Sequence, residues 1–209
     1  MIEAPSGSAT LNGVDGRADS PAPVPVPPQV RRRADAERNE RHIVEAAGAV
    51  LWRQPAATIG EIALASGLGR ATIYRHFPTR DDLLRGVARH GFEQTVQALR
   101  DARPEEGTAV EALVRMIEAS IQPGNACMLV LNQVPEPVAS NEEKAELHAP
   151  IAAALAGGEL RADLDIPWTL RTIGALYELA MQELASGNVT REEAVELMAS
   201  SLLQGALAR

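Results

Sequence analysis

Apolar residues recur at intervals of three and four along most of the chain after residue 34, as they do on one face of an α-helix. Ile43, Ala47 and Leu51 begin this pattern, and Pro55 interrupts it. Seven further segments repeat the spacing and are predicted helices: 59–66, 70–77, 80–100, 110–121, 142–155, 167–186 and 190–207. No stretch alternates apolar and polar residues for long enough to indicate a sheet. The pattern therefore predicts an all-α protein.

Capping residues and helix breakers define the boundaries of the second and third predicted helices. Thr58 is expected to cap 59–66, and Thr79 with Asp82 forms a capping box before the long helix that follows. Gly67 lies between the two short helices, where a tight turn can require a positive φ angle. Two short helices joined in this way form a helix-turn-helix, the unit that places its second helix in the major groove of DNA. An ordinary helical hairpin with a solvated face has the same spacing.

The first 33 residues have a different composition from the rest. They are rich in Pro, Gly, Ser and Ala, and residues 21–28 should be extended polyproline II. We therefore expect a disordered tail over 1–33. It lacks the apolar core of a signal peptide, and the longest apolar run of the chain, 126–131, is too short to span a membrane. These features favour a cytoplasmic protein.

The net charge of −8 argues against a polyanionic partner when it is taken over the whole chain. Its distribution changes that view. Residues 31–103 carry 13 Arg against nine acidic residues, giving +4, whereas 104–209 carry six basic against 16 acidic residues, giving −10. This asymmetry favours a polyanion-binding module joined to one that avoids polyanions, although a chance distribution of solvated charge would look the same.

The segment 67–84 has a distinctive sequence, Gly-Leu-Gly-Arg-Ala-Thr-Ile-Tyr-Arg-His-Phe-Pro-Thr-Arg-Asp-Asp-Leu-Leu, preceded by Ile-Ala at 62–63. It closely resembles the DNA-binding domain of the TetR family of transcriptional regulators. Gly69 departs from the family pattern, which usually has a Ser or Thr cap there. The resemblance implies a three-helix helix-turn-helix DNA-binding domain at 34–80, followed by a helical ligand-binding and dimerisation domain at 81–209. It also implies a repressor without enzymatic activity or cofactor, released from a near-palindromic operator by a small molecule.

The resemblance also implies which residues contact DNA. Arg70, at the start of the recognition helix, would read guanine, because its guanidinium matches O6 and N7. The other expected contacts, to phosphates or along the same face of the helix, are Thr58, Ala71, Thr72, Tyr74, Arg75, His76 and Arg80. Arg31, Arg32 and Arg33 would form a flexible arm in an adjacent minor groove. A solvated cationic flank is the alternative for these three residues.

The remainder of the chain is expected to hold a ligand cavity and a dimer interface. One recognition helix reads too few base pairs for tight binding, so a homodimer through 167–186 and 190–207 is expected. Residues 104–165 would bound a cavity that opens towards the helix at 80–100. Its candidate lining residues are Phe92, Met116, Cys127, Met128, Trp168, Tyr177 and Met181, with Asn125, Asn132 and His148 as candidate polar anchors. Ordinary core or surface positions are the alternative for each.

Cys127 is the only cysteine, which excludes an intramolecular disulfide framework and a multi-cysteine zinc site. No metal site is predicted. Two other functions remain open at this point. The first is an enzyme that uses Cys127 with His148, for which no orienting third group stands at a recognisable spacing. The second is a regulator in which oxidation of Cys127 is the switch.

Overall fold

The structure is a computed structural model that describes residues 28–131, 133–134, 137–156, 163 and 165–206. Within these residues all regular secondary structure is helical, which confirms the predicted all-α class. The helices are α1 (Pro28–Arg53), α2 (Ile59–Ser66), α3 (Arg70–His76), α4 (Arg80–Asp101), α5 (Ala109–Ser120), α6 (Cys127–Leu131), α7 (Asn141–Ala156), α8 (Ile166–Ala185) and α9 (Arg191–Ala206).

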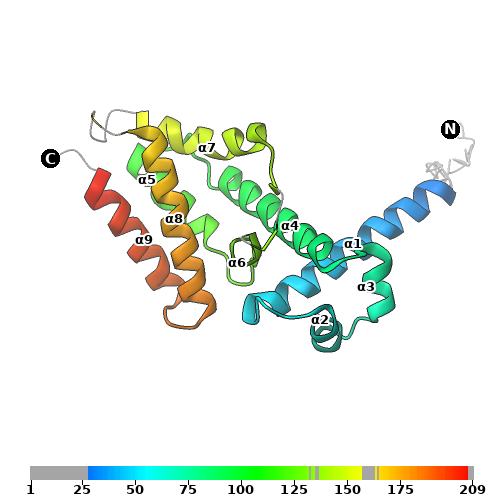
Figure 1. Cartoon of the computed structure of the whole chain (residues 1–209). Helices are drawn as coiled ribbons and strands as arrows, with labels where there is room; N and C mark the ends of the chain where they lie inside the picture. The colour runs from blue at the N-terminus through cyan, green and yellow to red at the C-terminus, as the bar shows by residue number, and fades with distance from the viewer. Residues whose placement is uncertain (1–27, 132, 135–136, 157–162, 164, 207–209) are drawn as a thin grey trace, which may run out of the picture.

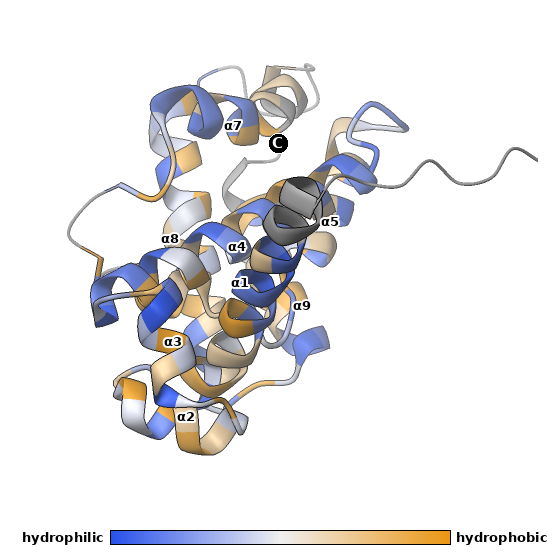
Figure 2. Cartoon of the chain, turned by 90° about the vertical axis from the view of Figure 1, so that its right-hand side faces the viewer, coloured by the Kyte–Doolittle hydropathy of each residue, from blue (hydrophilic) through white to orange (hydrophobic). Residues whose placement is uncertain are grey.

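The helices form two groups that α4 connects. Figure 1 shows α1, α2 and α3 at one end of the molecule and the pair α8 and α9 at the other, with α4 running from the first group towards the second. Figure 2 places α2 and α3 together at the end of the molecule opposite α7. Helix α4, which directly follows the helix-turn-helix, therefore connects the two groups of helices through the backbone.

The start of α1 differs from the prediction. Residues 28–33 were expected to belong to a disordered tail, but α1 begins at Pro28. Proline is well placed in a first helical turn, because its fixed φ suits the helix and its missing N–H is not needed there. The Arg and Ala residues that follow it have high helix propensity. The rest of the predicted tail, 1–27, lies outside the described residues.

Local sequence signals set the boundaries of α2, α3 and α4 as predicted. Thr58 and Glu61 form a capping box at the start of α2, and Thr79 and Asp82 form one at the start of α4. Each N-cap of this kind contributes about 1 kcal/mol relative to alanine. Gly67 ends α2 with φ 70°, in the left-handed region that glycine enters without steric cost.

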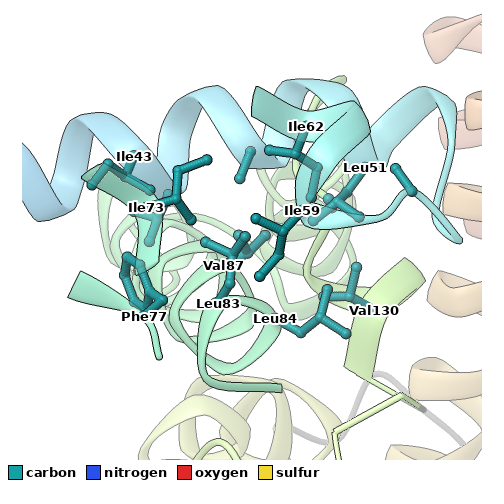
Figure 3. Packing of buried hydrophobic residues seen from close by; sticks show 14 of the residues in the cluster. Ile43, Leu51, Ile59, Ile62, Ile73, Phe77, Leu83, Leu84, Val87 and Val130 are labelled. Carbon is teal, nitrogen blue, oxygen red and sulfur yellow. The ribbon is translucent and has the colours of Figure 1, made fainter. Parts of the chain in front are cut away.

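The core beneath the helix-turn-helix contains residues from five helices. Figure 3 shows Ile43, Ile62, Ile73 and Leu84 converging on it, with Val130 of α6 beside Leu84. All five of these side chains have at most 1% of their surface exposed. Truncation of such a side chain to alanine costs about 2–5 kcal/mol. The position of α6 is therefore tied to the same core that holds α3.

A close approach between α4 and α6 extends this connection. A Cβ atom at Gly91 would lie 2.7 Å from Cβ of Cys127 and would also collide with the side chain of Asn125. Asn125 is buried, and its Nδ2 donates to the carbonyl of Gly91 at 3.0 Å and to Oγ1 of Thr95 at 3.1 Å. Glycine at position 91 allows α4 and the start of α6 to pack in direct contact.

Candidate DNA-binding surface and ligand cavity

Helix α3 presents polar and cationic side chains on a rigid support. Ile73 is completely buried and fixes the helix against the core. Arg70, Ala71, Tyr74 and Arg75 are exposed on the opposite side, and half of the Tyr74 surface is accessible. Gly69 occupies the N-cap position without a side-chain hydrogen bond, as its lack of a side chain requires. Among the predicted DNA contacts, these four and the half-buried Thr72 lie on one short helix.

The guanidinium of Arg70 lies across the start of α2. A Cβ atom at Gly60 would stand 2.6 Å from Nη2 of Arg70, so glycine leaves the space that this side chain occupies. Thr58 lies just before it and is exposed, with its hydroxyl donating to Oε2 of Glu61 at 2.7 Å. Hydrogen bonds from the backbone and side chain of Thr58 lower the pKa of Glu61. The beginning of α2 and the beginning of α3 therefore share one surface.

Arg80 does not have the role that the sequence suggested. It was expected to contact phosphate, but its guanidinium is directed into the protein. Nε donates to the carbonyl of Ala57 at 3.2 Å, and Nη2 donates to the carbonyl of Pro55 and to Oε1 of Gln133, both at 3.1 Å. These acceptors lie in the α1–α2 loop and after α6. Arg80 therefore fixes the position of the loop before α2, a role that sequence reasoning missed.

Two other predicted DNA contacts also differ in the structure. Nε2 of His76 is buried and has no hydrogen-bond partner in the part of the chain that the structure describes, so it does not face the surface. Arg31, Arg32 and Arg33 belong to the first turns of α1, so their backbone is helical where a flexible arm was expected. Arg70 and Arg75, the exposed arginines of α3, are therefore better placed to contact DNA than the other predicted cations.

A cavity of about 510 Å³ lies between α4 and the helices that follow it. Helices α4, α5, α6, α7, α8 and α9 and residues 134 and 137–139 all contribute to its walls, so it extends beyond the predicted region 104–165. Phe92, Thr95 and Leu99 line it from α4. The helix that begins beside the helix-turn-helix therefore forms part of the cavity wall some three turns later.

Five of the seven predicted lining residues face this cavity: Phe92, Met116, Cys127, Met128 and Tyr177. The other two predictions are wrong. Trp168 is 66% exposed at the start of α8, where Arg171 stacks on its ring at 5.7 Å, and Met181 is completely buried between α5, α8 and α9. Helical spacing identifies the faces of α8, but which neighbour covers each face depends on tertiary packing.

The three predicted polar anchors have different outcomes. His148 lines the cavity from α7. Asn125 is buried but does not line it, because its side-chain amide binds α4 and its Oδ1 accepts from the backbone N–H of Cys127 at 3.0 Å. Asn132 lies outside the described residues. Whether any lining residue binds a ligand remains a prediction.

Comparison with known proteins identifies the family. Residues 43–87 match the model of the bacterial regulatory proteins of the tetR family. The chain is 32% identical over 173 residues to the HTH-type transcriptional repressor LfrR of Mycolicibacterium smegmatis, a match that spans 81% of this chain and 90% of that protein. The chain belongs to the TetR family.

Solved structures of TetR-family proteins support this assignment along most of the chain. The crystal structure of LfrR from Mycobacterium smegmatis in complex with proflavine is 31% identical, covers 84% of this chain and 99% of that chain, and has a TM-score of 0.67. PfmR from Thermus thermophilus, at 20% identity and a TM-score of 0.59, covers 78% of this chain and 97% of that chain and shares the fold. The protein is thus a DNA-binding transcriptional regulator.

Family membership answers the question of enzymatic activity, because TetR-family proteins are DNA-binding regulators and not enzymes. The environment of Cys127 agrees with that. Its thiol donates to the carbonyl of Ala88 at 3.1 Å, and burial raises its pKa to about 12. A thiol of this kind is a poor nucleophile and a poor target of oxidation, since both reactions need the thiolate.

The described part of the chain contains no helix long and apolar enough to cross a membrane.

Proposed function

We propose that this TetR-family regulator is a ligand-responsive repressor that binds a near-palindromic operator as a homodimer and leaves it when a small molecule occupies the cavity. One observation carries the proposal: α4 begins at Arg80, beside the helix-turn-helix, and lines the cavity at Phe92, Thr95 and Leu99. A ligand that binds more tightly to a second arrangement of α4 shifts the population towards it. Such a shift changes the separation of the two recognition helices.

The DNA-binding domain is proposed at 34–80 and the ligand-binding and dimerisation domain at 81–209. Within the first, we infer that Arg70 reads guanine and that Thr58, Thr72, Tyr74 and Arg75 contact phosphates or neighbouring bases. Their support is their place on the surface that α2 and α3 share, where all but the half-buried Thr72 are exposed. Ala71 lies on the same exposed face.

Dimerisation is proposed through α8 and α9. Leu179 and Leu197 are 55% and 57% exposed on these helices, so each helix offers apolar surface that a partner could cover. Gly174 of α8 has open space where a Cβ would stand, but it lines the cavity, so the interface is placed on the faces that carry the two leucines. A symmetric dimer would place two recognition helices about 34–36 Å apart, one turn of DNA. The operator would then be near-palindromic.

The repressor proposal is tested on operator DNA selected from random sequence, labelled with a fluorophore. Anisotropy is measured as proflavine, the compound bound in the LfrR crystal structure, is added to the complex. Release of DNA at saturating compound, with full rebinding after the compound is removed, supports the proposal. A chain that binds no selected DNA would contradict it, and so would a complex that no cavity ligand dissociates.

A further inference from the structure

Most polar groups in the cavity wall already use their hydrogen atoms within the protein. The hydroxyls of Thr95 and Ser120 each donate to a carbonyl of their own helix at 2.9 Å. The thiol of Cys127 donates to Ala88, and the hydroxyl of Tyr177 donates to the carbonyl of Ser120, both at 3.1 Å. These groups therefore have no donor left for a ligand, and none of them carries a charge at neutral pH.

Lys144 and His148 differ from these groups. They lie one helical turn apart on α7, and both line the cavity. Across the described ranges, neither side chain forms a hydrogen bond or an ion pair. Burial, with a further contribution from the nearby Lys144 charge, lowers the pKa of His148. Lys144 is the only lysine of the chain and is exposed, so the cavity reaches solvent at this side chain.

Two of the three carboxylates near Lys144 on α7 pair with arginines of α4, and the third, Glu142, is exposed and does not line the cavity. Glu143 lies 2.6 Å from Nη2 of Arg89, and hydrogen bonds from Arg89 and the Ser140 backbone lower the pKa of Glu143 to about 2. Glu146 pairs with Arg100. The described lining residues include no Asp or Glu. Among the residues that the structure describes, the charged side chain that lines the cavity is therefore Lys144, and no carboxylate lines the cavity beside it.

Most of the remaining lining of the cavity is apolar. Four of its lining residues are at most 4% exposed: Leu113, Met116, Ile117 and Leu202. Their side chains carry no strong hydrogen-bond donor or acceptor. An apolar ligand body gains free energy by entering such a space, whereas a charged group loses free energy unless it is paired or stays near water. The favoured ligand has its charge at α7 and its apolar part inside.

We propose that the effector of this regulator is an amphiphilic monoanion, an apolar body bearing one carboxylate, with the carboxylate held between Lys144 and His148 at the mouth of the cavity. The inference rests on the proposed function and specifies the chemistry of its effector. A cation of the same size, such as proflavine at neutral pH, would meet the Lys144 charge and should bind more weakly than the anion. No carboxylate of the described lining would compensate it.

The test uses three probes with the same twelve-carbon chain and different head groups: dodecanoate, dodecan-1-ol and dodecylammonium. Each is titrated below its micelle concentration into the full chain at pH 7 by calorimetry. We expect dodecanoate to bind about tenfold more tightly than dodecylammonium, since a charge-assisted hydrogen bond replaces a repulsion. Equal or tighter binding of dodecylammonium overturns the proposal, as does the absence of dodecanoate binding.

Variants of Lys144 show whether its charge causes the preference for the carboxylate of dodecanoate. Lys144→Gln should weaken dodecanoate about fivefold to tenfold and leave dodecan-1-ol unchanged, and Lys144→Arg should restore dodecanoate binding. Arg38→Gln removes the same charge from the exposed surface of α1 and should have no effect. Dodecanoate binding that is insensitive to Lys144→Gln contradicts the assignment.

The same probes distinguish this inference from the repressor proposal. If dodecanoate binds as expected but leaves the operator complex intact, the cavity chemistry is supported and the effector role fails. If proflavine releases the operator while dodecanoate does not bind, the effector role is supported and the anion preference is wrong.

Discussion

Nη2 of Arg80 donates to Oε1 of Gln133 at 3.1 Å, joining the first residue of α4 to the segment after α6. The amide of Gln133 in turn donates to the carbonyl of Pro55 at 3.2 Å, and Arg80 donates to the same carbonyl. Leu131 and Val134, on either side of Gln133, line the cavity. Gln133 therefore connects the cavity wall to the α1–α2 loop through hydrogen bonds that do not run along α4.

Arg80→Ala should affect stability more than DNA contact. The carbonyl of Ala57 loses the Arg80 donor and that of Pro55 keeps only Gln133, so we expect the free energy of unfolding to fall by about 1–3 kcal/mol. The slope of log affinity against log salt concentration should remain as in the native chain. Arg75→Ala is the comparison, because each lost phosphate contact lowers the magnitude of that slope by about 0.9. Urea unfolding and salt-dependent anisotropy measure the two quantities. A reduced slope for Arg80→Ala would return Arg80 to the phosphate contacts.

Gln133→Ala should weaken the coupling between the cavity and the operator. Operator affinity without ligand should change little, whereas the ligand-induced loss of affinity should shrink by about 0.5–2 kcal/mol, the effect typical of residues between two coupled sites. Operator affinities measured with and without saturating ligand give this coupling free energy directly. Gln97→Ala, an exposed glutamine on α4, serves as the control. Unchanged coupling in Gln133→Ala would show that α4 alone transmits the effect.

Leu197→Glu should separate the dimer. A carboxylate placed at the centre of an apolar interface is desolvated without a partner, which costs far more than at an exposed site. Light scattering should report the monomer mass, and operator affinity should fall with it. Leu64→Glu makes the same change at a leucine that is 86% exposed on α2 and should leave the mass of the dimer unchanged. A dimer that survives Leu197→Glu places the interface elsewhere.

Cys127 should resist alkylation in the folded protein. With a pKa of about 12, its thiolate fraction at pH 8 is about one in ten thousand, and the fraction rises only as the pH approaches 12. Iodoacetamide should therefore modify Cys127 only after denaturation, as mass spectrometry can follow. Peroxide should likewise leave operator binding intact. Rapid modification of the native chain would restore the redox switch as a candidate.

Short-range signals made much of the helix-turn-helix predictable. Thr58, Gly67 and Thr79 act within three or four residues of their own position, through caps and a positive φ angle, so the chain on either side suffices to place them. Ile62 and Ile73 belong to regular apolar patterns, and their burial follows from those patterns.

The direction of individual polar side chains was less accessible from sequence. Arg80 binds acceptors that are 23, 25 and 53 residues away, and no local pattern contains them. Trp168 is apolar and lies on a predicted helix, yet the chain leaves it uncovered. The cavity itself is a product of six helices, so sequence could supply candidate lining residues but not the shape of the space.

Selection of bound sequences from random DNA tests most directly whether α3 reads the operator. The native chain and Arg70→Ala are each used to select bound sequences, which are then compared. We expect the native chain to yield an inverted repeat with half-sites about one turn apart. Arg70→Ala should yield the same repeat with preference lost at one guanine position in each half-site. Selection of no repeat by the native chain, or an unchanged motif with Arg70→Ala, would contradict the account.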